Sequence, residues 1–85
     1  MSNDAVDIVF PVVSQRSPDG DGVVATWYAR DGEAVFADQI ISEVQVDKVA
    51  FDVPAPVDGI LEVIVPEDGV VAQGTVIARV RMAGR

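Results

Sequence analysis

Short apolar segments rich in Val and Ile alternate along the chain with clusters of Gly, Pro and Asp, residue types that favour turns. β-Branched segments separated by turn signals about every eight to twelve residues are typical of sandwiches and barrels built only from strands. The pattern therefore predicts an all-β domain. The expected strands are Val6 to Phe10, Val23 to Tyr28, Ile40 to Val46, Val49 to Val53, Ile60 to Val65 and Thr75 to Met82.

An internal repeat divides the chain into two related halves. The segment 33–46 also fits the spacing of apolar residues on a helix, but its second copy contains Gly74, which would cost a helix about 1 kcal/mol. We therefore expect a turn followed by a strand in both copies. The matching segments are Asp21-Gly22-Val23-Val24 with Asp58-Gly59-Ile60-Leu61, Arg30-Asp31-Gly32 with Glu67-Asp68-Gly69, and, after a one-residue deletion, Gln39 to Val44 with Thr75 to Val80.

The duplication also predicts how the strands pack. Two related β units with one apolar face each bury those faces against one another, so we expect two small sheets related by an approximate two-fold axis. The side chains between the sheets are expected to be Val, Ile and Leu together with Phe36 and Phe51. A chain of 85 residues is long enough for one such domain and too short for two.

Composition removes most kinds of chemistry. The chain contains neither Cys nor His, which excludes disulfides, the usual zinc and haem ligands, and Ser-His or Cys-His nucleophilic systems. We therefore expect a protein that is not an enzyme by itself. A formal net charge of −8 repels phosphate backbones and anionic lipids, so neither nucleic acid nor a membrane is an expected partner.

Two sequence features bear on the compartment. No apolar run approaches the roughly 20 residues that a membrane-spanning helix needs. The first residues also lack a basic segment followed by an apolar stretch, which an export signal requires. We expect a soluble cytoplasmic protein, or a mitochondrial matrix protein if the chain is excised from a eukaryotic precursor.

The junction of the two halves holds the only lysine of the chain. Asp47-Lys48 separates Val46 from Val49 and predicts a two-residue hairpin turn. A lone lysine on an acidic surface is ordinarily a solvated charge. Lysine is not a specialised turn former, however, and this one occupies the midpoint of a duplicated β unit, where its amine would be fully exposed.

Several segments match a known pattern: Gly22-Val23-Val24-Ala25-Thr26-Trp27, Arg30-Asp31-Gly32-Glu33-Ala34-Val35, Glu43-Val44-Gln45-Val46-Asp47-Lys48-Val49 and Val53-Pro54-Ala55-Pro56-Val57-Asp58-Gly59-Ile60-Leu61. Together they resemble the lipoyl domains of 2-oxo acid dehydrogenase complexes, within the biotinyl/lipoyl carrier superfamily. The resemblance implies an all-β fold, a flattened barrel-sandwich hybrid of two four-stranded antiparallel sheets with pseudo-two-fold symmetry. It also implies a single lipoyl-binding domain over residues 1–85, with a core from about 6 to 82.

In this resemblance Lys48 matches the lysine that carries lipoic acid in amide linkage, flanked by Asp47 and Val49. A lysine amine is protonated at neutral pH, so a lipoate ligase or an octanoyltransferase must bring the group in activated form. The implied function is a swinging arm that shuttles acyl groups and electrons. Its implied partners are a thiamine diphosphate-dependent 2-oxo acid decarboxylase, an acyltransferase core with coenzyme A, and dihydrolipoyl dehydrogenase. The chain would belong to the dihydrolipoyllysine acyltransferase component.

Two other functions remain open from the sequence. Biotin carriers of the superfamily flank their lysine with Met on both sides, where this chain has Asp47 and Val49. A lipoyl-like interaction module without any cofactor would have no need of a lysine at the midpoint. Many lipoyl domains have Glu and Thr or Ser where this chain has Gln45 and Val46, which leaves open which lipoylating enzyme acts.

The resemblance covers carriers that serve pyruvate, 2-oxoglutarate, branched-chain and acetoin systems alike. It also covers both free-standing carriers and domains cut from a multidomain acyltransferase. In the family, the loop that corresponds to Ser14 to Asp21 lies beside the lipoyl-lysine and helps a partner recognise the domain. We expect the same place and role for it here.

Overall fold

The computed structural model describes residues 4–13 and 21–82. Within those ranges it contains β-strands and no helix. All the expected strands are confirmed, with ends shifted by at most two residues. Two further strands, β3 and β7, contain only two and three residues, too few to show alternation in the sequence. The strands are β1 (Ala5–Val9), β2 (Asp21–Trp27), β3 (Ala34–Val35), β4 (Ile40–Val46), β5 (Val49–Pro54), β6 (Gly59–Val63), β7 (Val70–Ala72) and β8 (Val76–Arg81).

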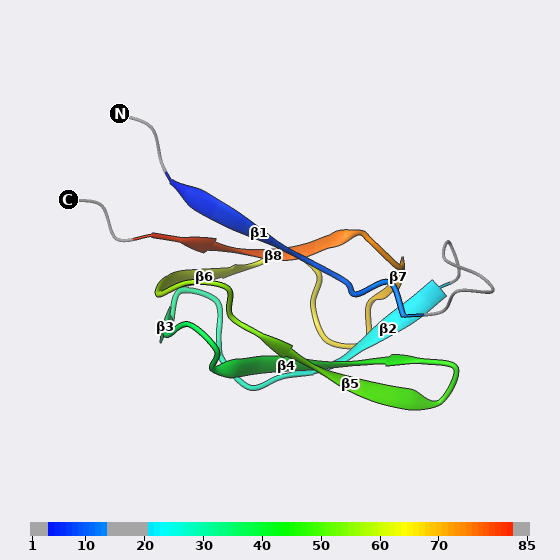
Figure 1. Ribbon diagram of the computed structural model, residues 1–85. Coiled ribbons are helices and arrows are strands. Elements are labelled where there is room, and N and C mark those ends of the chain that lie inside the picture. The colour runs from blue at the N-terminus through cyan, green and yellow to red at the C-terminus, as the bar shows by residue number, and fades with distance from the viewer. Residues whose placement is uncertain (1–3, 14–20, 83–85) are drawn as a thin grey trace.

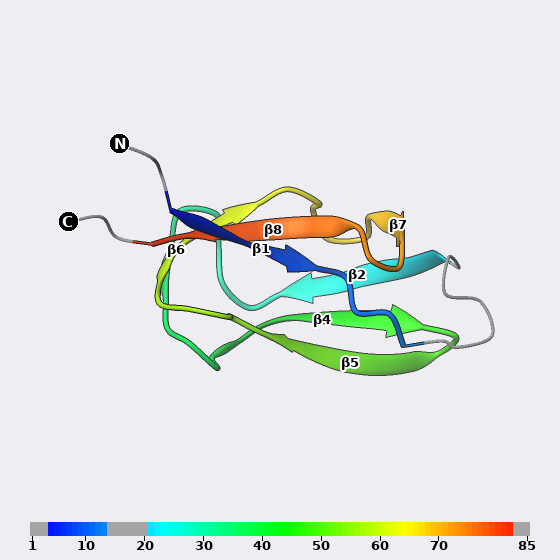
Figure 2. The ribbon, with the colours of Figure 1, turned by 45° about the horizontal axis from the view of Figure 1, so that its top comes forward.

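The strands form two antiparallel sheets of four strands each. One has the order β1-β8-β6-β3 and is called here the terminal sheet; the other has the order β5-β4-β2-β7 and is called the hairpin sheet. Advancing every strand number by four converts the order of one sheet into that of the other. Figures 1 and 2 show the two sheets facing each other in an elongated molecule of 43 × 23 × 19 Å. The expected two-sheet fold with pseudo-two-fold symmetry is confirmed.

Backbone hydrogen bonds obey the same symmetry. The amide of Gly32 donates to the carbonyl of Leu61 at 2.7 Å, and the amide of Asp68 donates to the carbonyl of Val24 at 2.7 Å. Each bond therefore ties the turn before one short strand, β3 or β7, to a long strand of the other half. Neither half completes its backbone hydrogen bonding without its counterpart.

These bonds correct the expected alignment of the repeat. Gly32 is equivalent to Asp68, whereas the expected match of Arg30-Asp31-Gly32 with Glu67-Asp68-Gly69 placed it opposite Gly69. The extra residue of the first half lies in β2, whose pairing with β4 shifts between Val24 and Thr26. A β-bulge adds one residue to one strand, so the two halves can differ in length there and still make equivalent hydrogen bonds in the turn that follows. The deletion therefore lies before the turn rather than after it.

The core lies between the sheets and uses two further bulges, which are related by the pseudo-two-fold symmetry. In β4 and β8 the pairing skips one residue, Ile41 and Ile77 respectively, and both isoleucine side chains are fully buried. Ser42 is also fully buried, and its hydroxyl donates to the carbonyl of Thr26 at 2.8 Å, so its burial leaves no unsatisfied donor. The partly buried Phe51 packs against this core, as expected.

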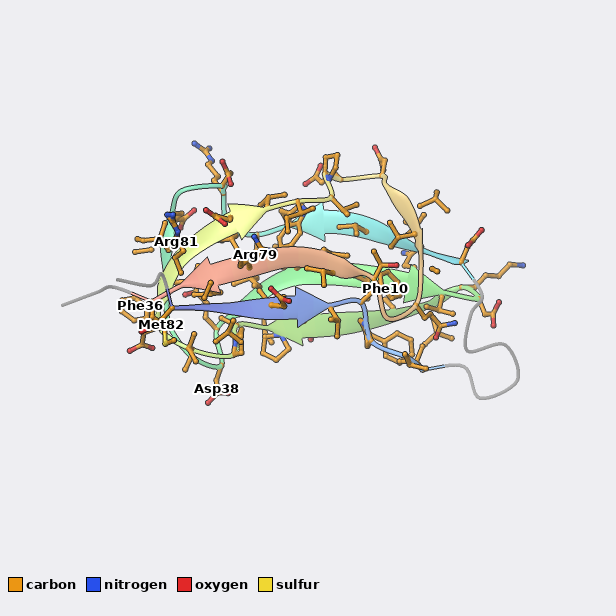
Figure 3. All side chains as sticks on the ribbon, turned by 90° about the horizontal axis from the view of Figure 1, so that it is seen from above. Phe10, Phe36, Asp38, Arg79, Arg81 and Met82 are labelled. Atoms are coloured by element: carbon orange, nitrogen blue, oxygen red, sulfur yellow. The ribbon has the colours of Figure 1, made fainter. Side chains whose placement is uncertain are left out.

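Phe36 does not belong to the core, contrary to the expectation. Its side chain is 65% exposed, and Figure 3 shows it at the same end of the molecule as Met82. The inward position is taken by Val35, which is 1% exposed. Strand alternation ends after Val35, and the amide of Phe36 donates instead to Oε1 of Gln39 in the following turn.

Candidate functional site

The connection between β4 and β5 consists of Asp47 and Lys48 alone, because Val46 pairs directly with Val49. Asp47 has a φ of 51° and Lys48 a φ of 69°. Two successive residues with positive φ are the signature of type I′ hairpin turns, whose twist matches that of the flanking strands. The expected two-residue turn is confirmed. Gly is the preferred residue at the second position, which Lys48 occupies here.

Asp47, Lys48 and Val49 are all exposed. The turn lies at one end of the long molecule, and the start of β1 and the end of β8 lie at the other (Figures 1 and 2). At that other end the amide of Met82 donates to the carbonyl of Asp4 at 2.8 Å. The lysine amine therefore projects from the end of the domain opposite to the two chain ends.

The sheet beneath the turn is firmly packed. Val46 is 5% exposed and Phe10 is fully buried. The Phe10 ring lies so close to Gly22 that a Cβ on that residue would overlap it, so glycine is required there for packing. The amide of Phe10 also donates to the carbonyl of Thr75 at 2.8 Å. The exposed turn thus stands on a base that is fixed from both halves of the chain.

No carboxylate within residues 4–13 and 21–82 forms an ion pair with the lysine amine. Within the described ranges, the ion pairs join Arg79 to Asp7 at 3.1 Å and Arg81 to Glu62 at 3.4 Å. All four of these residues belong to the terminal sheet. The Lys48 amine is thus left accessible to an incoming enzyme.

A shallow depression of about 260 Å³ lies beside the lysine on the outer face of the hairpin sheet. Val23 of β2 and Val70 of β7 pair directly in this sheet, and the latter side chain is 62% exposed. This feature was not predicted from the sequence, where an apolar residue directly after the Gly69 turn was the only local signal. The residues that line it are Asp21, Gly22, Val23, Gln45, Asp47, Lys48 and Val70.

Two carboxylates lie farther along this outer face. Glu43 and Asp52 are paired neighbours on β4 and β5, and Tyr28 donates its hydroxyl hydrogen bond to Glu43 Oε1 at 3.1 Å. This hydrogen bond, together with slight desolvation and the two negative charges, raises the pKa of Tyr28 above 10.0. This part of the outer face of the hairpin sheet is therefore anionic.

Glu67 ties the turn before β7 to the end of β2. Its Oε2 accepts hydrogen bonds from the amide of Trp27 and the hydroxyl of Thr26, both at 3.0 Å. These two bonds, the backbone one first, lower the pKa of Glu67 below its ordinary 4.5. The indole of Trp27 donates to the carbonyl of Val65 at 3.0 Å, and its partly buried ring packs against the core.

Other kinds of site find no support in the described part of the chain. Residues 4–13 and 21–82 contain no group of three or more acidic side chains arranged to hold a metal ion. No helix long and apolar enough to cross a membrane occurs there. The loop from Ser14, expected beside the lysine turn, lies outside the described residues as far as residue 20.

Comparisons with known proteins agree with this geometry. A family model described as "Biotin-requiring enzyme", of biotin/lipoyl type, matches residues 7–80. The dihydrolipoyllysine-residue succinyltransferase component of the 2-oxoglutarate dehydrogenase complex of Escherichia coli K12 is 36% identical over 78 residues, which are 91% of this chain and 19% of that protein. The mitochondrial counterpart from Mus musculus is 32% identical over 83 residues, 96% of this chain and 18% of that protein. The chain thus spans about a fifth of the length of these curated relatives.

A solved structure agrees over nearly its whole length. The lipoyl domain of the 2-oxoglutarate dehydrogenase complex from Azotobacter vinelandii superposes with a TM-score of 0.74 and 33% identity, covering 94% of this chain and 99% of that domain. Family match, relatives and fold point the same way, and the chain belongs to the biotin/lipoyl family as a lipoyl domain of the 2-oxo acid dehydrogenase type.

Proposed function

We propose that residues 1–85 act as one lipoyl carrier domain, with a core from about 6 to 82, and that Lys48 Nζ carries lipoic acid in amide linkage. The observation that carries this proposal is the conformation of Lys48. It is the only lysine of the chain, and it occupies a left-handed position with φ 69° that disfavours every residue with a Cβ. Its presence there requires a reason other than backbone preference.

The residues of the turn fit such a group. Attachment requires an amine that an enzyme can reach, and the exposed Lys48 extends from a turn with no ion-pair partner in the described ranges. Asp47 and Val49 flank it without covering it. The lysine nitrogen, once deprotonated within the transferring enzyme, would attack an activated lipoyl or octanoyl carbonyl. The bond between that carbonyl and its activating group breaks as the amide forms, the activating group leaves with the bonding electron pair, and the nitrogen loses a proton.

The attached group would supply what this polypeptide lacks, a disulfide that accepts an acyl group together with an electron pair and later yields both. The domain contributes position, because a tethered reactant reaches each active site at an effective concentration that can approach millimolar. The chain is then a carrier that moves acyl groups and electrons and performs no catalysis of its own.

The expected partners are those that this role requires. They are a lipoate ligase or octanoyltransferase, a thiamine diphosphate-dependent 2-oxo acid decarboxylase, an acyltransferase core with coenzyme A, and dihydrolipoyl dehydrogenase. The Escherichia coli and Mus musculus relatives belong to 2-oxoglutarate dehydrogenase complexes, which supports membership of an acyltransferase component of that general kind. Relatives from bacteria and from mitochondria support the bacterial cytoplasm or the mitochondrial matrix as the compartment.

Lipoylation of Lys48 is tested by co-expression with a lipoate ligase and lipoic acid. One lipoyl group per chain is expected, located at Lys48 by peptide mass spectrometry. Loss of one positive charge changes the formal charge from −8 to −9, so the modified protein should move faster toward the anode in a native gel.

Lys48→Arg and Lys48→Gln are the controls, and both should remain unmodified because neither offers an amine. Modification of either variant would refute the assignment. A parallel culture with biotin ligase and biotin tests the alternative carrier. Asp47 and Val49 replace the Met flanks of biotin carriers, so no substantial biotinylation is expected.

A further inference from the structure

The depression beside Lys48 combines two features that face outward from the hairpin sheet. Lys48 forms part of its wall, and Val23 and Val70 form an apolar strip next to it. Farther along the same face lie the carboxylates Glu43 and Asp52. An apolar strip on such a surface suggests an apolar occupant.

The pseudo-two-fold axis supplies an internal comparison. The position of Val23 is equivalent to that of Ile60, and the position of Val70 to that of Ala34, and Ile60 and Ala34 also pair directly. Ile60 has Arg81 as its other neighbour in the sheet, whereas Val23 has the uncharged Gln45. The two ends of the domain therefore have equivalent strand pairing but different side chains on the surface.

We infer that this depression seats the dithiolane end of the lipoyl arm on Lys48 whenever no enzyme holds the arm. The inference rests on the proposed function, since it requires lipoylation of Lys48. The dithiolane and its methylene chain are apolar and uncharged, which fits the strip formed by Val23 and Val70. Asp21 and Asp47 at the rim disfavour anionic occupants.

The tether makes even weak docking effective. The arm is attached to a wall of the depression, so its local concentration there is millimolar or higher, and a contact with millimolar affinity is occupied about half of the time. The seat is shallow and open, so a partner enzyme can draw the arm away. The arm thus alternates between a docked and a free state, and only the free state reacts.

The first test compares three forms of the protein with isotope-labelled valine methyl groups: unmodified, acetylated on Lys48, and lipoylated. Intact mass verifies each modification beforehand, so failure of lipoylation is recognised separately from failure of docking. Acetylation gives the same amide and the same charge without the long arm. We expect nuclear Overhauser contacts from the dithiolane to the methyls of Val23 and Val70 in the lipoylated form alone. Identical valine spectra for the acetylated and lipoylated forms would overturn the inference.

The second test measures the rate at which dithiothreitol reduces the lipoyl group. If about half of the arms are docked, the native domain reacts about half as fast as a domain whose arm is always free. Val70→Asn should therefore raise the rate about twofold, whereas Ala34→Asn, the same residue introduced at the symmetry-equivalent position, should leave it unchanged. Equal rates in all three proteins would contradict docking. If Val70→Asn instead slows lipoylation by the ligase and leaves reduction unchanged, the strip is a contact for that enzyme and the inference is wrong.

Discussion

Lys48 occupies a backbone conformation that is unfavourable for lysine. A left-handed conformation brings the Cβ of any residue except glycine close to the following carbonyl. Asp47 tolerates this conformation because its short side chain can bond locally, whereas lysine has no such compensation. The turn is therefore less stable than the same turn with glycine in second place, and the amine is what the chain gains.

Lys48→Gly should stabilise the domain while abolishing lipoylation. Relief of the left-handed strain, offset in part by the greater freedom of glycine in the unfolded chain, should raise the free energy of unfolding by about 0.5–1 kcal/mol. Chemical denaturation of the unmodified proteins measures this difference. Asp38→Gly is a matched control, since Asp38 has a φ of 70° at a turn remote from the lysine. A less stable Lys48→Gly protein would show that the turn is not strained.

The length of each element, and the separation of its residues along the chain, explain what could be predicted from the sequence. The longer strands were recognisable because each contains several β-branched residues between turn signals, and the Asp47-Lys48 turn because both residues are adjacent in the chain. β3 and β7 were not predicted because two or three residues are too few to show an alternation of apolar and polar positions. The strip of Val23 and Val70 was not predicted because these residues come together only when β2 pairs with β7.

The local sequence pattern also gave wrong predictions where backbone geometry determines the direction of a side chain or the place of a bulge. Phe36 is apolar and comes directly after Val35, but the strand ends between them, so alternation no longer determines its direction. The one-residue shift of the repeat was visible in the sequence, yet its place was not, because a bulge has no composition of its own. Hydrogen bonds of Gly32 and Asp68 were needed to locate it.

Carboxylates tie each turn to a long strand at equivalent places in the two halves. Asp31 Oδ1 accepts from the amide of Val63 at 2.8 Å, and Glu67 Oε2 accepts from the amide of Trp27 at 3.0 Å. Both bonds join elements far apart in the chain. They are expected to hold the short strands β3 and β7 in register, since those strands contribute few ladder bonds of their own.

Acid should weaken the Glu67 tie. The pKa of Glu67 is lower in the folded protein than its ordinary 4.5, so its stabilising contribution is present above that pH and is lost as the pH falls through the folded value. The melting temperature of the native protein should therefore fall more steeply below pH 4.5 than that of Glu67→Gln. Asp68→Asn removes the same charge one residue away and should follow the native curve. Parallel curves for the native and Glu67→Gln proteins would refute this role.

At the scale of the whole molecule, charge is unevenly distributed. The arginines of β8 are paired with Asp7 and Glu62 on the terminal sheet. Around the lysine, by contrast, Asp21 and Asp47 border the depression, and Glu43 and Asp52 lie farther along the hairpin sheet. Within residues 4–13 and 21–82, Lys48 is the one basic residue of that end, and the proposed lipoylation would remove its charge. The modified end would therefore attract a basic rim around a partner's active-site channel more strongly than the unmodified end does.

Reductive acylation of the lipoylated domain by a decarboxylase of a 2-oxoglutarate dehydrogenase complex should consequently depend on salt. Its kcat/KM should fall several-fold between about 50 and 500 mM salt, because ions screen the steering field, whereas acylation of free lipoamide should change little. Asp21→Asn should weaken the salt dependence. Asp38→Asn, which makes the same change at the opposite end (Figure 3), should not. Equal effects of both variants would assign the dependence to net charge alone.

The hydrogen bond between Met82 and Asp4 has a geometric consequence for reach. It brings the two ends of the folded core together at one pole, and the lysine turn lies at the other, along an axis of 43 Å. Anything that anchors the protein by its ends would thus hold the lysine at the far end of a stiff sandwich. A rigid domain extends the distance that the proposed lipoyl group on Lys48 can reach from the anchor. It does so without the conformational entropy of a flexible tether of equal length.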